Sequence, residues 1–255
     1  MIINRLFRTV LVILAALVFT TTLGLAAIIA GLLGVKDRPN GIYDFVPRKW
    51  SRIMLWAAGV KVTVHGAETL VEGEPHIFVS NHLSWFDIPS LAGYLPRYKF
   101  VAKAELFKVP VFGPAIKAIG MIPIERENRK LAFQSYEVAA KKIQEGNSVV
   151  VYPEGTRGTG YALRPFKKGP FVLAIAAGVP IVPVLLHGTL EVLGKTSKSV
   201  RPGRVDIHLL EPIPTAGMSY DDREKLANDV RGRMVAALER EYGIKSPEVG
   251  KSRAE

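Results

Sequence analysis

A histidine and an aspartate five residues apart form the first pair in the chain that could perform acid–base chemistry. They stand in Asn81-His82-Leu83-Ser84-Trp85-Phe86-Asp87, which follows the apolar run Ile77-Phe78-Val79 and precedes a helix-like stretch. Open α/β sheets place their sites at such strand-to-helix turns. On one continuous helix the two side chains would point about 140° apart. If His82 instead lies before the helix and folds back over its start, Asp87 can accept from one imidazole nitrogen and leave the other as a general base.

Two structural roles would explain the same residues without catalysis. Ser84-x-x-Asp87 has the form of a capping box, in which the aspartate serves only to satisfy helix N–H groups. His82 could equally be an ordinary surface residue of the turn. The pair therefore requires support from elsewhere in the chain.

A second polar group, Pro153-Glu154-Gly155-Thr156-Arg157, also follows an apolar run, at 149–152. Gly155 lets the backbone approach a ligand closely, Thr156 offers a hydroxyl group, and Arg157 offers a planar fork suited to phosphate. The alternative is a polar turn that contains an ion pair between Glu154 and Arg157.

Further cations stand at strand ends. Arg126 closes the stretch Gly120-Met121-Ile122-Pro123-Ile124-Glu125-Arg126 and is a second candidate phosphate ligand, and Lys103 ends another strand pattern. Solvated strand ends are the alternative interpretation, and a solvated turn is expected at Lys167 and Lys168.

Other chemistries are excluded or disfavoured by the sequence. The absence of cysteine excludes disulfides, thiolate catalysis and iron–sulfur clusters. The five histidines show no metal-ligand spacing, so no metal is expected. The sequence contains no H-E-x-x-H, G-x-S-x-G, Walker or G-x-G-x-x-G motif.

Four short motifs, in this order, resemble the glycerolipid acyltransferase family, and most of all its bacterial 1-acyl-sn-glycerol-3-phosphate acyltransferases. They are N-H-x4-D at 81–87, the glycine-to-arginine stretch at 120–126, E-G-T-R at 154–157 and V-P-I-V-P at 179–183. The resemblance covers about residues 60–215. The chain departs from the family at Pro123, where an aromatic residue is usual, and this leaves the shape of the acceptor pocket open.

The resemblance implies transfer of a fatty acyl group from acyl-CoA or acyl carrier protein to the 2-hydroxyl of lysophosphatidate, which gives phosphatidate. His82 would be the base and Asp87 its orienting partner, with no cofactor besides the acyl thioester substrate. Residues implied in substrate binding are Asn81, Lys103, Arg126, Glu154, Gly155, Thr156 and Arg157. The rival hypotheses are transfer to another lysophospholipid or to glycerol 3-phosphate, and a non-enzymatic membrane protein that binds anionic lipids.

The elements that must position these residues are those of an α/β domain over residues 61–243. Short β-rich runs alternate with helical patterns, which predicts a mixed, largely parallel central sheet flanked by helices. Three prolines, Pro153, Pro180 and Pro183, are expected at strand ends or sheet edges, and residues 244–255 are expected to form a loose tail. Strands are predicted at 61–64, 76–80, 98–102, 121–124, 148–152, 180–185 and 204–210, and helices at 129–145, 171–177 and 220–242.

Residues 1–60 are predicted to anchor the domain to a membrane through N-terminal membrane helices. The stretch 9–35 has no charged residue, and as a helix of roughly 40 Å it would cross a ~30 Å hydrocarbon layer. Its length disfavours a cleaved signal peptide. A basic helix with two tryptophans at 47–59 suits the headgroup boundary, and the alternative is an ordinary amphipathic helix packed on the domain. The two helices could form a span plus a surface helix, or a hairpin dipping into one leaflet.

The distribution of charge predicts on which side of the membrane the domain lies and which kinds of partner it binds. Only Arg5 and Arg8 precede the apolar stretch, whereas the C-terminal flank is richer in cations, which predicts a catalytic domain on the cytoplasmic face of the cell membrane. The whole chain carries a formal charge of +11, which favours phosphate-bearing substrates and anionic membrane lipids. The scattered cations and the lack of a readable recognition module argue against nucleic acid. The cations of the C-terminal flank are Lys36, Arg38, Arg48, Lys49 and Arg52.

Overall fold

A seven-stranded mixed sheet forms the centre of the computed structural model, which describes residues 2–125 and 129–248. The strands lie in the order β1-β7-β6-β2-β5-β3-β4. From β6 to β4 all neighbours are parallel, whereas β7 runs antiparallel to β6 and parallel to β1. The predicted mixed, largely parallel sheet is confirmed. The strands are β1 (Val60–His65), β2 (Ile77–Ser80), β3 (Tyr98–Lys103), β4 (Ile122–Ile124), β5 (Ser148–Val151), β6 (Ile181–His187) and β7 (Gly203–Leu209).

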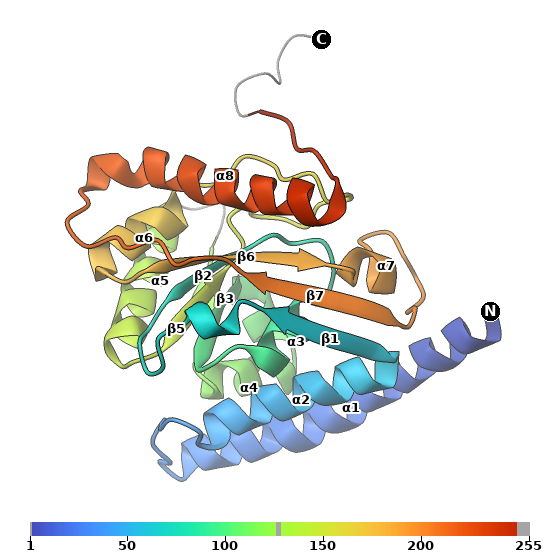
Figure 1. Cartoon of the computed structure of the whole chain (residues 1–255). Coiled ribbons are helices and arrows are strands. Elements are labelled where there is room, and N and C mark those ends of the chain that lie inside the picture. The colour runs from blue at the N-terminus through green and yellow to red at the C-terminus, as the bar shows by residue number, and fades with distance from the viewer. Residues whose placement is uncertain (1, 126–128, 249–255) are drawn as a thin grey trace.

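Helices cover both faces of the sheet (Figure 1). Strands β2 and β5 lie in its middle and are apolar throughout, because a central parallel strand is buried on both faces. Ile77 and Val79 pack on the side of α5, α6 and α8, while Phe78 packs on the side of α2 and α3. The helices of the domain are α3 (Asp87–Tyr94), α4 (Phe112–Ala118), α5 (Arg129–Gln144), α6 (Gly169–Ala177), α7 (Thr189–Leu193) and α8 (Arg223–Tyr242), with the 3-10 turns η1 (Ala67–Thr69), η2 (Ala104–Lys108) and η3 (Tyr220–Asp222).

The N-terminal segment forms an antiparallel helical hairpin of α1 (Ile2–Leu32) and α2 (Ile42–Ala58) along one side of the domain (Figure 1). Arg8 of α1 donates to the carbonyl oxygens of Trp56 and Ala57, and Trp50 Nε1 donates to Thr20. The apolar helix begins earlier and ends earlier than predicted. The second helix begins five residues before the predicted start and continues through Pro47, which lies beyond the first turn and cannot donate a hydrogen bond to the Tyr43 carbonyl oxygen.

One face of α1 packs on α2 and α4, and its other face is exposed and apolar. The close approach to α4 uses Gly24, where an added Cβ would lie 3.1 Å from Ala115 Cβ. Residues 3–32 form the single stretch in the described part of the chain that is long and apolar enough to cross a membrane. The exposed large side chains of α1 are Ile3, Leu6, Phe7, Val10, Ile13, Leu14, Leu17, Val18, Leu25, Ile29 and Leu32.

The turn of this hairpin is clamped to the sheet by ion pairs. Asp37 lies 3.0 Å from Arg97 Nη2 and 3.0 Å from Lys99 Nζ. The Lys99 side chain is buried and also donates to the Ile119 carbonyl oxygen. Burial lowers the pKa of Lys99, and the charge of Asp37 opposes that shift. The hairpin therefore belongs to the body of the molecule.

One of the three prolines lies where the sequence did not predict it. Pro153 and Pro180 lie just outside strands, but Pro183 lies inside β6 between β2 and β7, so its predicted place at an edge or end is wrong. The position tolerates proline because regular pairing with β7 begins only at Val184, while the Pro183 carbonyl oxygen accepts from Leu210 N–H.

The segment after α8 was expected to be loose, yet its first residues contact the domain. Ser246 Oγ accepts the Leu163 N–H at 2.9 Å, and the Pro247 carbonyl oxygen accepts from Arg231 at 2.7 Å. Residues 249–255 lie outside the described part of the chain.

Candidate active site

The histidine and the aspartate of the first motif meet at the turn between β2 and α3. Helix α3 begins at Asp87, so His82 precedes the helix and folds back over its start. His82 Nδ1 lies 2.7 Å from Asp87 Oδ2, and the same oxygen accepts the N–H groups of Leu83 and Ser84 at 2.6 and 2.8 Å. One carboxylate thus both orders the turn and orients the imidazole. Among the described residues His82 Nε2 has no hydrogen-bond partner, which leaves it available as an acceptor.

Tyr152, which sequence reasoning missed, stacks on the imidazole. The two ring centroids are 4.0 Å apart with an interplanar angle of 18°. Burial and the nearby charge of Asp87 raise the pKa of Tyr152 well above its ordinary value, so the phenol stays neutral. A signal was present in the sequence, because Tyr152 directly follows β5 as His82 closely follows β2. Val79 and Val151 are partners in the register of these two strands.

Two of the predicted substrate-binding residues hold the loops of the site together. The Asn81 amide donates to the Leu186 carbonyl oxygen and accepts from Leu186 N–H. Glu154 Oε1 accepts His82 N–H at 3.3 Å, and Oε2 lies 2.9 Å from Arg164 Nε. Both side chains are buried. Contact of Asn81 or Glu154 with a substrate stays a prediction, since their described partners are protein groups.

Arg157 pairs with Trp85 rather than with the carboxylate of Glu154. Its guanidinium carbon lies 4.9 Å from the centroid of the Trp85 ring, within the range of a cation–π contact. Within residues 2–125 and 129–248 the guanidinium makes no hydrogen bond, so its donors are available to an anion. The alternative of an ion pair between Glu154 and Arg157 is not what the structure contains.

Of the remaining predicted substrate ligands, the structure describes Lys103, Gly155 and Thr156. Gly155 adopts a φ of +76°, a backbone conformation that favours glycine, and the flexible end of the Lys167 side chain lies over it, with Cε 2.7 Å from where a Cβ would be. Lys167 therefore packs on the E-G-T-R turn. Lys103 Nζ lies 2.7 Å from Glu105 Oε1. Arg126 lies outside the described residues.

A cavity of about 740 Å³ joins these groups to the helical hairpin. Its polar lining comes from His82, Lys103, Thr156 and Arg157 and, on the hairpin, from Thr20 and Ser51. Apolar side chains from α1, α2, α3, α4 and β3 contribute most of the rest. The apolar part includes Leu23, Met54, Phe86, Phe100, Phe112 and Ile116. A histidine oriented by a carboxylate, two cations and a long apolar wall therefore share one cavity.

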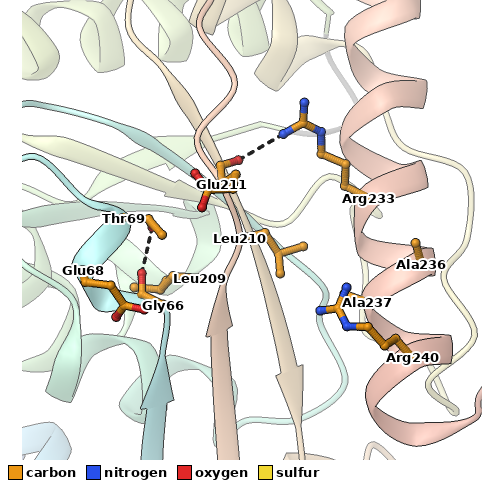
Figure 2. Close-up of a pocket in the computed structure, with 10 residues that line it drawn as sticks. All are labelled: Gly66, Glu68, Thr69, Leu209, Leu210, Glu211, Arg233, Ala236, Ala237 and Arg240. Atoms are coloured by element: carbon orange, nitrogen blue, oxygen red, sulfur yellow. Dashed lines mark hydrogen bonds between the residues drawn. The ribbon is translucent and has the colours of Figure 1, made fainter.

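A second, shallow pocket of about 440 Å³ lies between η1, the end of β7 and α8 (Figure 2). Arg233 donates there to the Glu211 carbonyl oxygen at 3.4 Å. Strands β1 and β7 run in the opposite direction to β2. Their carboxyl ends therefore lie at the opposite end of the sheet, along the strand direction, from His82. This pocket shares no lining residue with the cavity.

The described residues contain no group of three or more histidine, aspartate or glutamate side chains that could hold a metal ion. The polar side chains that line the cavity include an imidazole oriented by a carboxylate and the cations of Lys103 and Arg157.

Fold and site together define an α/β protein in which a carboxylate-oriented histidine faces an apolar cavity built partly by an N-terminal helical hairpin. Residues 61–187 match the family model of the acyltransferases. The chain belongs to the acyltransferase family.

Similar proteins support this assignment. The chain is 30% identical over 211 residues to the 1-acyl-sn-glycerol-3-phosphate acyltransferase BAT2, chloroplastic, of Brassica napus, with 78% of this chain and 61% of that protein covered. It is 36% identical over 182 residues to the 1-acyl-sn-glycerol-3-phosphate acyltransferase alpha of Bos taurus, with 71% and 63% covered. The chain thus spans about three fifths of the length of these relatives.

A solved structure has the same fold over nearly the whole chain. The crystal structure of the 1-acyl-sn-glycerophosphate acyltransferase PlsC from Thermotoga maritima superposes with a TM-score of 0.78 at 27% identity. The match covers 94% of this chain and 98% of that one, so it includes most of the N-terminal hairpin as well as the domain.

Proposed function

We propose that the protein transfers a fatty acyl group from acyl-CoA or acyl carrier protein to the 2-hydroxyl of 1-acyl-sn-glycerol 3-phosphate, forming phosphatidate. The observation that carries the proposal is the 2.7 Å contact between His82 Nδ1 and Asp87 Oδ2 in a cavity that also contains Arg157. The names of the relatives in plants, animals and Thermotoga maritima point to the same acceptor.

In this mechanism His82 Nε2 accepts the proton of the acceptor hydroxyl as its oxygen attacks the thioester carbonyl carbon. A new C–O bond forms, the C–S bond breaks, and the departing thiolate takes the proton from the imidazolium. General-base help of this kind contributes roughly 10²–10⁴ in rate. Asp87 accepts from Nδ1–H, which fixes the tautomer and stabilises the imidazolium.

The acceptor phosphate would bind at the cationic part of the cavity. Arg157 offers a planar donor fork that has no hydrogen-bond partner in the described chain, and Lys103 lies on the same cavity wall. Arg126 is the third proposed phosphate ligand. The apolar wall formed with the hairpin suits the single acyl chain of the acceptor or the chain being transferred.

We further propose that the hairpin dips into one leaflet of the cell membrane, with the domain on the cytoplasmic face. Helix α1 packs on α2 and α4 at several points between Arg8 and Gly31. Because of these contacts it cannot cross the bilayer as a separate helix detached from the domain. Its exposed apolar face would enter the acyl region, and the basic flanks of α2 would meet anionic headgroups.

The test is acyl transfer by detergent-purified protein with lysophosphatidate and labelled long-chain acyl-CoA or acyl carrier protein. His82→Ala should lose about 10²–10⁴ of the wild-type rate at an unchanged melting temperature. His65→Ala is the matched control, because His65 is half exposed and stands on β1 outside the cavity.

Retained activity in His82→Ala would overturn the mechanism. Transfer only to glycerol 3-phosphate or another lysophospholipid would replace the proposed acceptor. Folded wild-type protein that binds anionic vesicles and turns over none of these substrates would overturn the enzyme proposal.

A further inference from the structure

The connection between α7 and β7 carries positive charge without any acidic residue. Residues 192–205, which run from the end of α7 through the connection into the start of β7, include four lysines and arginines and no aspartate or glutamate. All four side chains are exposed, and within the described chain none pairs with a carboxylate. Lys61 on the neighbouring strand is the register partner of the last of them, although adjacent like charges cost stability. The four are Lys195, Lys198, Arg201 and Arg204.

This basic connection starts at the rim of the active-site cavity. Leu193 lines the cavity, and Ser84 Oγ donates to its carbonyl oxygen at 2.7 Å. Gly194 forms a β-bridge with Ser84, within the segment that carries His82 and Asp87. Lys195 Nζ lies 3.4 Å from the Arg157 carbonyl oxygen. Lys195 therefore stands next to the proposed phosphate ligand, on the outer side of the cavity.

The far end of the connection is fixed as well. Val200 N–H donates to Thr9 Oγ1 of α1 at 2.9 Å, and Arg201 N–H donates to the Val192 carbonyl oxygen at 2.9 Å. Figure 1 shows this connection beside the N-terminal part of α1. Lys198 is three residues from Lys195, so their Cα atoms are at most about 11 Å apart. The cations are thus held near one another by backbone contacts rather than by ion pairs.

We propose that Lys195, Lys198 and Arg201 bind the phosphate end of the phosphopantetheine arm of the acyl donor. The inference rests on the proposed function, which already uses Arg157 for the acceptor phosphate and His82 for the thioester. A phosphopantetheine donor brings a second anion at the other end of its arm. An arm that leaves His82 past Leu193 reaches this acid-free cationic connection at the rim of the cavity.

Coenzyme A and acyl carrier proteins share this phosphate, so kinetics with three donors test the proposal. The variant Lys198→Ala/Arg201→Ala leaves the Arg157 neighbourhood intact. Its KM should rise about tenfold for acyl-CoA, acyl carrier protein or both. The kcat/KM for acyl-N-acetylcysteamine, a phosphate-free donor, should not change, and neither should the KM for lysophosphatidate. Lys225→Ala is the matched control, because Lys225 is an exposed cation on α8.

The pattern across donors identifies the source of the phosphate. A rise with acyl-CoA alone assigns the site to coenzyme A, and a rise with the carrier protein alone assigns it to that protein. Unchanged KM values with both donors would overturn the proposal. So would an equal loss with the phosphate-free donor accompanied by weaker binding to anionic vesicles, which would mark the connection as a membrane contact.

A binding measurement separates this proposal from the proposed function. Calorimetric titration with coenzyme A needs no turnover, and its Kd should be about tenfold weaker in Lys198→Ala/Arg201→Ala than in wild type. Weaker binding in a protein that transfers no acyl group to lysophosphatidate would contradict the proposed acceptor and retain the donor site. Equal binding of coenzyme A by the two proteins, together with an unchanged KM for acyl carrier protein, would overturn the donor site whatever the acceptor.

Discussion

At the scale of single residues, the arrangement around His82 depends on contacts from three separate segments. Asp87 orients the ring, Tyr152 stacks on it, and Glu154 accepts its backbone N–H. The spacing of His82 and Asp87 is readable in the sequence because both belong to one local turn. Tyr152 was not readable in the same way, since its place beside His82 depends on the pairing of β2 with β5.

A pair of substitutions separates the ring of Tyr152 from its hydroxyl. The buried hydroxyl has no hydrogen-bond partner in the described chain, so Tyr152→Phe should keep kcat within about threefold and leave the melting temperature unchanged or higher. Tyr152→Leu removes the stacked ring and should lower kcat at least about tenfold, because a misplaced base transfers protons poorly. Steady-state kinetics and thermal melts check both. A large loss in Tyr152→Phe would show that the hydroxyl takes part in the reaction.

At the scale of secondary-structure elements, histidines link the far edge of the sheet to the end of α8. His65 stacks on His208 with centroids 4.5 Å apart, and His208 Nε2 lies 2.7 Å from the hydroxyl of Tyr242. The Tyr242 ring stacks on His187 at 3.6 Å. Strands β1, β7 and β6 and helix α8 are thus joined through stacked and hydrogen-bonded rings.

These contacts predict that acid weakens the fold. Burial lowers the pKa of His187 and of His208, while the charge of Asp206 opposes both shifts. A histidine whose pKa is lower in the folded state binds fewer protons there than in the unfolded chain. The free energy of unfolding should therefore fall, by on the order of 1 kcal/mol, as the pH drops below about 6.5.

Denaturant unfolding at pH 7.5 and pH 5 measures this loss. The variant His187→Asn/His208→Asn should be less stable at pH 7.5 but should show a smaller difference between the two pH values. Stability that is equal at both pH values in the wild-type protein would contradict the assignment of neutral histidines to this edge.

At the scale of the whole molecule, the N-terminal hairpin offers the membrane a continuous apolar surface. Leu17→Glu places a charge on the exposed face of α1, where Leu17 is 67% exposed. Binding to lipid vesicles should fall at least about tenfold at an unchanged melting temperature, because a charge is costly in the acyl region. Val138→Glu is the control, since Val138 is an exposed apolar residue on α5. Equal vesicle binding by both variants would remove α1 from the membrane contact.

Sequence patterns located the strands and the larger helices of this molecule because short apolar runs between turn residues specify them locally. They did not give the strand order, in which β6 lies between β7 and β2, since pairing joins distant segments. For the same reason Pro183 was expected at an edge. The site was readable where a motif is contiguous, as at Glu154 to Arg157. The sequence did not indicate a role for Lys195, because it is backbone contacts between segments far apart in the sequence that bring Lys195 to the cavity.

The clamp between Asp37 and Lys99 has a practical consequence for anyone who wishes to work with a soluble fragment. Removing the first 60 residues would take away the counter-ion of Lys99 and would open the wall of the cavity that Leu23 and Met54 form. The hairpin and the domain share the ion-pair clamp and the cavity wall, so truncation at the apparent boundary should yield aggregated protein rather than a smaller enzyme.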